Sequence, residues 1–585
     1  MLLKHITFWI ALVTLPMATA FSIPDFNFQA RPTYAGSAKR LFFNGSERQI
    51  DKNNVSQLTV KWQFQTGAIV TASPVIYPIK LNKSKPVSIV FVQSWDNNLY
   101  ALRLSNGTEV WRFKTEVQPG AGFPNVGSVH IDIVDGKQRL FFGAGETMYA
   151  LEPSTGKQIW KFYAGTGCSE KSKLCGFGKE RNQTESSPIV ANGKVIFGMD
   201  VNDLEGGKGG VYALDARDGR LQWYFDVDTA QTCRAFPRDE IRAFDGYHTE
   251  QQLGLPQGFL ASRPGCDFAR TPTGCGNVWS SPAVDFKRRF IFLASSNCDV
   301  DEDPKTLKPS PPSSPFNEAI FALDFDGTPV WRWRPRETCE GGGFECFNAD
   351  LAFGAVPNLF RIQVNGRLRD VVGVGNKDGT YYVIDRDGIN HYNGVRWDDL
   401  DAKQLPYWRR NVVPGGVAGG ILATAAVDER SRRIYFSTAP GGINDTFNPQ
   451  TPTIHALNMD TGDVLWQNFT EKPDDASFSP VSAIPGVAFT GSILQGVLRA
   501  YDTDTGLLLA RIPIAEPVSI PGFPQQIPTP IVSGAVIYNG IVIVGAGTGQ
   551  RSENPADLFN ISSFLPQKIT ALCVPGTPAC HKSNE

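Results

Sequence analysis

The chain is poor in charge. Charged residues make up only 19% of its 585 residues and nearly cancel, which leaves a net charge of −2. No basic patch suits a nucleic acid, and no polybasic run suits a membrane surface. After the N-terminus, no stretch is apolar for the ~20 residues that a membrane-spanning helix needs. The sequence therefore predicts no nucleic-acid partner, no membrane span and a soluble mature protein.

Several motifs that carry chemistry are also missing. The six histidines are scattered and no C-x-x-C occurs, which argues against a zinc site. The sequence has no G-x-S-x-G and no H-E-x-x-H, so a serine hydrolase or a zinc peptidase has little support. It also lacks a C-x-x-C-H heme motif.

Turn-forming and aromatic residues are abundant. The chain has 57 glycines and 41 prolines, and 11% of its residues are aromatic, a composition that favours β structure with many turns. Its length exceeds one ordinary domain unless the architecture is a repeat.

The N-terminus has the pattern of a secretory signal peptide. Lys4 supplies a positive flank, residues 6–15 form an apolar core, and residues 18–20 (Ala-Thr-Ala) form a small-residue cleavage site. We expect residues 1–20 to be removed, residues 21–585 to form one domain, and the protein to be secreted.

The cysteines and the glycosylation sequons fit an oxidising secretory compartment. The spacing of the cysteines pairs Cys168 with Cys175, Cys266 with Cys275, Cys339 with Cys346 and Cys573 with Cys580, and leaves Cys233 and Cys298, which could pair with each other. The sequons lie at Asn44, Asn54, Asn82, Asn106, Asn182, Asn444, Asn468 and Asn560.

One pattern recurs along the chain: an aromatic-Ala-Leu-Asp strand, a turn with Gly, and a strand that ends in Trp. The copies are YALRLSNGTEVW (Tyr100–Trp111), YALEPSTGKQIW (Tyr149–Trp160), YALDARDGRLQW (Tyr212–Trp223), FALDFDGTPVW (Phe321–Trp331), YVIDRDGINHYNGVRW (Tyr382–Trp397), HALNMDTGDVLW (His455–Trp466) and AYDTDTGLLLA (Ala500–Ala510). Each reads as a β-hairpin, and a further apolar strand pair precedes each one. The repeating unit is therefore about four antiparallel strands.

Trp62 resembles the last strand of a blade whose other strands come from the C-terminus. Counting Trp62 with the seven copies gives eight units. We predict an all-β fold, an eight-bladed β-propeller closed by its N- and C-terminal strands, in which the Trp residues pack between blades.

The stretch from Trp279 to Asn297 reads as a further hairpin that turns at Lys287-Arg288-Arg289. Its Trp offers a flat π-face and its Asn an amide oxygen. Together with the repeat, which covers about residues 55–570, this stretch resembles the quinoprotein alcohol dehydrogenases. These are eight-bladed propellers that hold pyrroloquinoline quinone (PQQ) and Ca²⁺ or a lanthanide ion on the axis.

The resemblance implies the following site. Trp279 matches the Trp that stacks on PQQ. Asn297 lies at the family's spacing from this Trp and matches the metal-binding Asn. Lys377, in GNKDGTYYVIDRDG (Gly375–Gly388), takes the place of the cation beside the quinone carbonyls. Thr184 and Ser186 lie near positions that hydrogen-bond PQQ.

The metal-binding carboxylate stays open between two residues. When the family's metal-binding position is counted forward from Pro188, it falls on Asp203. Counting back from Tyr212 leaves an offset of one residue, so Glu205 is the alternative ligand. Either suits a hard cation. The stretches NADLAFGAVPNLF (Asn348–Phe360) and PGGVAGGILATAAVD (Pro414–Asp428) look like polyvinyl-alcohol-dehydrogenase-type members.

The sequence also departs from the family pattern. The adjacent Cys-Cys pair that covers the other quinone face is absent, and so is a clear counterpart of the Arg near it. In the family, the catalytic Asp lies in a G-D-N stretch before the Ala-Leu-Asp strand. The corresponding segment here reads SSPFNEAIFALD, and Ser313 occupies the position of the catalytic Asp. Glu318 is the nearest acid and our candidate base, and Asp299, Asp301 and Asp303 are alternatives.

We therefore carry two hypotheses. The first is a secreted PQQ-dependent oxidoreductase that oxidises an alcohol or polyol with a divalent or lanthanide ion, and passes electrons to an external acceptor because it has no heme motif. The second is a secreted propeller without chemistry, which binds or scaffolds a partner and has kept only the repeat.

Overall fold

The structure is a computed structural model of the chain. The residues that it describes are 30–81, 85–117, 122–164, 183–200, 209–227, 229–234, 257, 277–296, 316, 318–335, 351–389, 406–416, 419–439, 452–468, 477–493, 495–519, 526, 529–549 and 558–581. No helix among them is long and apolar enough to cross a membrane.

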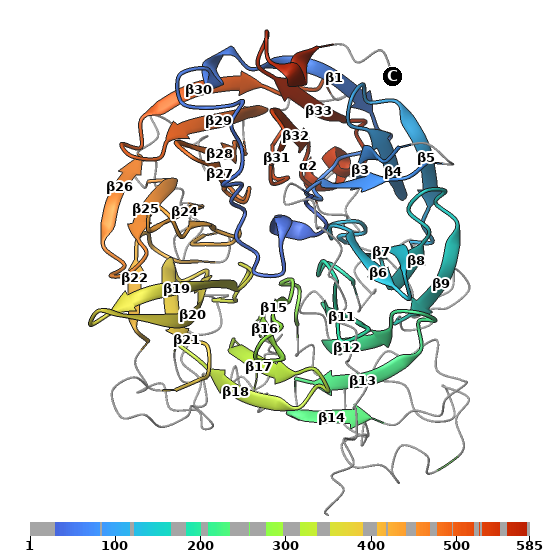
Figure 1. Cartoon of the computed structure of the whole chain (residues 1–585), viewed down its shortest axis with the longest axis vertical. Coiled ribbons are helices and arrows are strands. Elements are labelled where there is room, and N and C mark those ends of the chain that lie inside the picture. The colour runs from blue at the N-terminus through green and yellow to red at the C-terminus, as the bar shows by residue number, and fades with distance from the viewer. Residues whose placement is uncertain are drawn as a thin grey trace, which may run out of the picture.

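The described residues form eight antiparallel sheets arranged as blades of a ring (Figure 1). Blade 1 holds β2 (Val75–Ile79), β3 (Val87–Ser94), β4 (Asn98–Arg103) and β5 (Glu109–Lys114). Blade 2 holds β6 (His130–Val134), β7 (Lys137–Ala144), β8 (Thr147–Leu151) and β9 (Gln158–Tyr163). Blade 3 holds β10 (Ile189–Ala191), β11 (Lys194–Met199), β12 (Gly210–Asp215), β13 (Leu221–Asp226) and β14 (Gln231–Arg234). Blade 4 holds β15 (Ala283–Asp285), β16 (Phe290–Ala294), β17 (Ile320–Asp324) and β18 (Pro329–Trp333).

The other blades follow the same plan. Blade 5 holds β19 (Asn358–Val364), β20 (Arg367–Gly375), β21 (Thr380–Asp385) and β22 (Trp408–Asn411). Blade 6 holds β23 (Ala426–Asp428), β24 (Arg433–Ser437), β25 (Ile454–Asn458) and β26 (Val464–Asn468). Blade 7 holds β27 (Ser482–Ile484), β28 (Val487–Gly491), β29 (Val497–Asp502) and β30 (Leu508–Pro513). Blade 8 holds β31 (Val536–Tyr538), β32 (Ile541–Gly545), β33 (Lys568–Cys573) and β1 (Thr59–Gln65).

The helical segments are short. They are η1 (Tyr34–Gly36), η2 (Val55–Gln57), α2 (Leu558–Ser563) and η4 (Pro578–Cys580).

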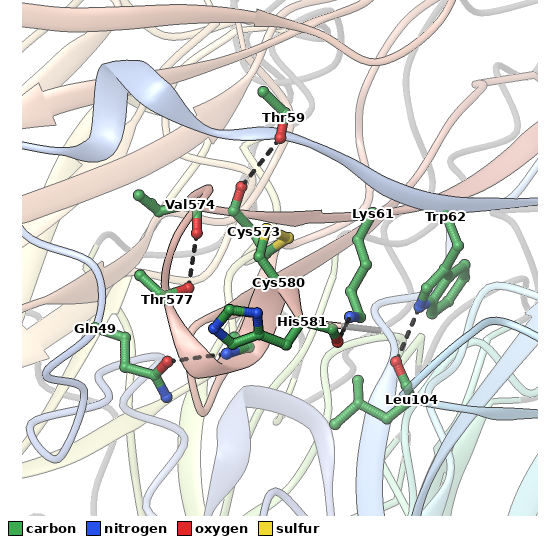
Figure 2. Close-up of a disulfide and its surroundings, with 11 residues drawn as sticks. Gln49, Thr59, Lys61, Trp62, Leu104, Cys573, Val574, Thr577, Cys580 and His581 are labelled. Carbon is green, nitrogen blue, oxygen red and sulfur yellow. Dashed lines mark hydrogen bonds between the residues drawn. A yellow bond between two sulfur atoms is a disulfide. The ribbon is translucent and has the colours of Figure 1, made fainter. Parts of the chain in front are cut away.

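The ring closes between the two ends of the chain, as predicted. Strand β1 is the outermost strand of blade 8 and pairs antiparallel with β33, with Thr59 opposite Cys573 and Gln65 opposite Lys568. Figure 2 shows this junction, where a disulfide joins Cys573 to Cys580 and Lys61 Nζ donates a hydrogen bond to the carbonyl of His581 at 3.2 Å. The predicted all-β, eight-bladed fold is confirmed.

Two details differ from the prediction. Blade 3 carries a fifth strand, β14, because the insertion after Trp223 first adds an edge strand, whose Arg234 donates to the Asp326 carbonyl of blade 4 at 2.9 Å. In blade 5 the Trp of the outer strand is Trp408 and not Trp397, which lies outside the described residues. The repeat spacing missed this because an insertion separates the turn of blade 5 from its last strand.

The repeated Trp residues pack between blades, as predicted. The indole N–H of each one donates to a backbone carbonyl of the next blade, and the ring lies over the turn glycine there. The Trp and carbonyl pairs are Trp62–Leu104, Trp111–Pro153, Trp160–Ala216, Trp223–Phe325, Trp331–Arg386, Trp408–Met459 and Trp466–Thr503, at 2.9 to 3.2 Å. The glycines are Gly107, Gly156, Gly219, Gly327, Gly388, Gly462 and Gly506, all with positive φ.

Residues 30–46 cross the centre of the ring, and we call them the axial strap (Figure 1, dark blue). The strap follows the blades in their order and covers the free edges of their innermost strands, which would otherwise leave unpaired backbone groups. Backbone carbonyls of Arg31, Pro32, Ala38, Lys39, Leu41 and Phe42 accept hydrogen bonds from the N–H groups of Ile76, Ile131, Val284, Leu359, Val427 and Ala483 in turn.

The described cysteines agree with an oxidised protein. Among them Cys573 and Cys580 form the predicted disulfide, and the buried Cys233 is disulfide-bonded. The other cysteines of the predicted pairs lie outside the described residues: Cys168, Cys175, Cys266, Cys275, Cys298, Cys339 and Cys346.

The sequons differ in their surroundings. Asn44 is buried and its amide N–H donates to the Ile537 carbonyl at 3.0 Å, so the folded ring has no space for a glycan there and this prediction is wrong. Asn106 is exposed, whereas Asn54 and Asn468 are half-buried. Asn560 lies in α2. Asn82, Asn182 and Asn444 are outside the described residues.

Candidate functional site

The predicted site residues come from segments that end on one face of the ring. Neighbouring strands are antiparallel, so the segments that enter each innermost strand and the loops between the second and third strands share a face, which we call the leading face. Trp279 precedes β15, Glu318 precedes β17 and Lys377 follows β20. Thr184 and Ser186 precede β10. All five residues therefore lie at the leading face.

Trp279 stands at the start of the predicted hairpin, which is confirmed with Asp285 opposite Phe290. Its indole is half-buried. Gly354, in blade 5, lies against the ring edge: a Cβ built on Gly354 would be 2.5 Å from Cη2 of Trp279, and 3.1 Å from Leu422 Cδ2. The missing side chain at 354 therefore leaves room for the indole.

Lys377 is connected to the same group of residues. Its backbone N–H donates to the Ala352 carbonyl at 3.1 Å, two positions from Gly354, and its carbonyl accepts from Gly416 at 3.2 Å. The buried Asn376 beside it donates to the Leu351 carbonyl at 2.8 Å. Blade 5 thus holds the half-buried Lys377 next to the segment that contacts Trp279.

Glu318 joins the group through Ser296. The Glu318 N–H donates to the Ser296 carbonyl at 3.0 Å, and the Ser296 N–H donates to the Asn277 carbonyl at 2.9 Å, two positions before Trp279. Glu318 has φ 45°, in the left-handed region that non-glycine residues seldom adopt. Such backbone strain is often found at functional sites. Backbone hydrogen bonds thus link the segments that carry Trp279, Lys377 and the candidate base Glu318, whose roles stay predictions.

Thr184 and Ser186 serve blade packing. The Thr184 hydroxyl donates to the Gly145 carbonyl at 2.7 Å, and the fully buried Ser186 Oγ accepts from the Gly198 N–H at 3.1 Å. Their contact with a cofactor stays a prediction.

The predicted metal ligands Asn297, Asp203 and Glu205 lie outside the described residues. So do the alternative acids Asp299, Asp301 and Asp303, and Ser313. Within the described ranges, no three His, Cys, Asp or Glu side chains form a group that could hold a metal ion.

The motifs did not identify two features of this face. One is Gly354, which only tertiary contact with Trp279 singles out. The other is a chain of buried serines that links the starts of the innermost strands: Ser187 Oγ accepts from Ser128 N–H and Ser281 Oγ from Ser187 N–H, both at 2.9 Å. The Ser-Pro pairs in ASPVI, SSPIV and SSPAV are the signal that could have found it.

The described residues fit a flat aromatic cofactor with carbonyl oxygens. A half-buried indole with Gly354 against its edge offers one planar surface. The half-buried Lys377, whose backbone bonds to the Ala352 segment, supplies an ammonium group on the same face.

The sequence is similar to polyvinylalcohol dehydrogenases. It is 25% identical over 497 residues to that of Sphingopyxis sp. (strain 113P3), covering 79% of this chain and 63% of the relative. It is 25% identical over 540 residues to that of a Pseudomonas sp., covering 86% of this chain and 71% of the relative. The chain thus spans under two thirds of the length of the first of these relatives.

A solved structure and a family model agree with this. The fold is similar to that of quinohemoprotein alcohol dehydrogenase ADHIIG from Pseudomonas putida HK5, with a TM-score of 0.65 and 17% identity over 94% of this chain and 81% of that one. The model of the PQQ β-propeller domain of glucose, ethanol and alcohol dehydrogenases matches residues 32–390, more than half of the chain. The chain therefore belongs to the family of PQQ-type glucose/ethanol/alcohol dehydrogenase β-propellers.

Proposed function

We propose that the protein is a secreted quinoprotein oxidoreductase that oxidises the hydroxyl group of an alcohol or polyol with PQQ and a divalent or lanthanide ion, Ca²⁺ being our first candidate. The observation that supports the proposal is that Trp279, Lys377 and Glu318 lie on hydrogen-bonded neighbouring segments of the leading face, where Gly354 contacts the Trp279 ring. The similarity to polyvinylalcohol dehydrogenases supports a polyol as substrate.

The chain's own residues have separate tasks in this proposal. The Trp279 indole provides the surface on which the quinone stacks, and Gly354 sets how deep that indole lies. The Lys377 ammonium would stabilise negative charge on a quinone oxygen. When bound, PQQ supplies a carbonyl that accepts a hydride from the alcohol carbon.

Glu318 is the group that we assign to the hydroxyl proton. A carboxylate at hydrogen-bond distance from an alcohol accepts its proton as the C–H bond breaks. The left-handed backbone of Glu318, two residues before β17, sets the direction in which this side chain points. Asn297 and either Asp203 or Glu205 would hold the metal ion, because amide and carboxylate oxygens suit hard cations.

Two further parts of the proposal concern the cell and the acceptor. The signal-peptide pattern of residues 1–20 and the disulfide of Cys573 with Cys580 support secretion. The absence of a C-x-x-C-H motif from the sequence supports an external electron acceptor. Asn106 supports glycosylation, since it is exposed and its Oδ1 accepts from the Thr108 hydroxyl of the same sequon at 2.8 Å.

Reconstitution tests the proposal. Purified protein is mixed with PQQ and Ca²⁺, and dye reduction is followed with simple alcohols, diols and polyvinyl alcohol. We expect quinone binding and turnover in the wild type, and a loss of roughly a hundred-fold in kcat for Lys377→Met. Arg361→Met, at an exposed position of β19 in the same blade, is the control and should keep full activity. Absence of both quinone binding and turnover across the panel would favour the non-catalytic propeller.

A further inference from the structure

The axial strap carries a buried cation. Arg40 is 0% exposed, and all its hydrogen-bond acceptors are neutral. Its Nε donates to the Pro282 carbonyl at 2.8 Å, and its Nη1 to the Thr33 hydroxyl and the Tyr34 carbonyl at 2.7 and 2.9 Å. Its Nη2 donates to the Ser187 carbonyl at 3.5 Å. The guanidinium is therefore well hydrogen-bonded but carries an uncompensated charge.

No carboxylate among the described residues bonds to Arg40 or forms an ion pair with it. The acid on the neighbouring strand β6, Asp132, instead lies 3.9 Å from the ring of His130. Burying a guanidinium without a counter-ion is costly, and burial lowers the pKa of Arg40 to about 9. Binding of an anion nearby would offset part of this free-energy cost.

Arg40 lies beneath the candidate site. Its acceptor Pro282 is three positions after Trp279, and its acceptor Ser187 directly follows Ser186. Three residues span at most about 10 Å and the hydrogen bond to Pro282 adds 2.8 Å, so the guanidinium is within about 13 Å of the Trp279 backbone.

We propose that Arg40 is a positioning residue that makes the leading face selective for an anionic ligand, and that the ligand is the carboxylate-bearing PQQ. The inference rests on the proposed function. PQQ carries three carboxyl groups, which are ionised at neutral pH, and a buried cation near the Trp279 segment attracts them through a low-dielectric medium. Neither Arg40 nor the strap touches the reacting atoms in this account.

The experiment measures binding of PQQ and of its uncharged trimethyl ester to the folded protein by quenching of tryptophan fluorescence. We expect the wild type to prefer PQQ to the ester. Arg40→Met should bind PQQ roughly ten-fold more weakly and bind the ester as the wild type does. Arg40→Lys, which keeps the charge, should restore most of the preference.

A second pair of variants keeps the guanidinium in place, in case Arg40→Met does not fold. Thr33→Asp puts a carboxylate on Arg40 and cancels its charge, while Thr33→Asn has the same size without the charge. Only Thr33→Asp should lose the preference for PQQ.

The outcomes separate the two ideas. If the wild type binds no PQQ, the proposed function fails. If it binds PQQ but Arg40→Met and Thr33→Asp keep its full preference over the ester, the function stands and the role of Arg40 is wrong. An equal loss of PQQ and ester binding would make Arg40 merely structural and would also overturn the inference.

Discussion

At the scale of single residues, the contact between Gly354 and Trp279 controls the proposed cofactor surface. A Cβ on Gly354 would approach Cη2 of Trp279 to 2.5 Å, which is closer than side-chain carbons tolerate. Because Gly354 does not have a positive φ, its backbone accepts alanine without strain. Its role is to make room for the indole rather than to provide a special backbone conformation.

Gly354→Ala should therefore displace the indole and leave the blades folded. We expect roughly ten-fold weaker PQQ binding, since overpacking of this kind costs about 1–3 kcal/mol. Fluorescence titration measures it. The matched control is the double variant Gly354→Ala and Trp279→Phe. The smaller Phe ring should accommodate the new Cβ, so the effects of the two substitutions on PQQ affinity should not be additive. Unchanged affinity in Gly354→Ala would show that the indole is not the stacking surface.

His455 gives the protein a pH-dependent stability. The fully buried ring lies between the Gln467 amide, which donates to Nδ1 at 2.8 Å, and the Thr438 hydroxyl, 2.9 Å from Nε2. Thr438 in turn donates to the Pro452 carbonyl, so Nε2 carries the proton and the ring is neutral. Burial lowers the pKa of His455 from its usual 6.5 to about 3.

The sign of the effect follows from this lowered pKa. Between pH 6.5 and 3 the unfolded chain binds a proton at His455 and the folded chain does not, so acid favours unfolding. We expect the free energy of unfolding to fall by about 1 kcal/mol between pH 7 and 5.5 from this residue. Urea titrations at both pH values measure it. His455→Asn should show a smaller pH dependence than the wild type, and equal slopes would contradict the assignment.

Sequence motifs alone supplied candidates for part of the site. Trp279 and Lys377 stand in local motifs whose spacing can be recognised in a single sequence, and their roles stay predictions. Gly354 and Arg40 have no local signal, because their importance arises from contacts with residues far away in the sequence. Glu318 was chosen as the nearest acid, and the structure adds its backbone conformation.

At the scale of elements, neighbouring blades are joined by one recurring contact, which we call the joint: the Trp ring of one blade packs on a turn glycine of the next. This joint recurs because an indole covers a wide surface and its N–H satisfies a turn carbonyl. The joint between blades 7 and 8 is the exception: Ala510 occupies the Trp position, and a Cβ on Gly576 would meet nothing within 4 Å. Val55 and Leu58, from the segment before β1, pack into that core instead.

Substitution of Trp160 tests the contribution of a regular joint. Its N–H donates to the Ala216 carbonyl at 3.2 Å, and its ring covers Gly219. Trp160→Phe should cost about 1 kcal/mol for the lost hydrogen bond, and Trp160→Ala about 3–5 kcal/mol, in urea unfolding. Phe286→Ala, at a side chain 57% exposed, is the control and should change stability by under about 0.5 kcal/mol. Equal effects of all three would refute the packing role.

The repeat made these elements predictable. An aromatic-Ala-Leu strand and a Gly turn encode a hairpin locally, so seven copies sufficed to predict the blades. The prediction went wrong at Trp397, because an insertion moved the last strand of blade 5 to Trp408. Strand β14 was missed for the same reason: an edge strand added by an insertion has no counterpart in the repeat.

At the scale of the whole molecule, the strap and the terminal strands make one closed ring from eight similar units. The sequence predicted the closure at Trp62, since that residue lies in a strand of the kind that completes a blade but lacks the strands that should precede it. It did not predict the strap, whose contacts with the blades run largely through backbone groups and leave no pattern in side chains. A propeller's centre is thus harder to predict than its blades.

Closure of the ring depends on the pairing of β1 with β33, and the disulfide lies where that pairing ends. Cys573 is opposite Thr59, and its bond to Cys580 holds the turn from which His581 accepts a hydrogen bond from Lys61. Constraining this turn lowers the entropy of the unfolded chain most directly at the place where the two ends must meet. The disulfide should therefore stabilise the entire ring and not blade 8 alone.

The double variant Cys573→Ala and Cys580→Ala tests this. We expect a loss of about 2–3 kcal/mol in the free energy of unfolding, the value for so short a loop, with all blades still unfolding together. Urea titration followed by both tryptophan fluorescence and far-ultraviolet circular dichroism measures the midpoint and the cooperativity. When both proteins are measured with a reductant, the wild type should approach the midpoint of the variant. The reductant breaks the bond between Cys573 and Cys580 in the wild type, as well as any other disulfide in both proteins. If the oxidised wild type and the variant share one midpoint, the closure needs no covalent support and rests on the β1–β33 hydrogen bonds and the contact of Trp62 with blade 1.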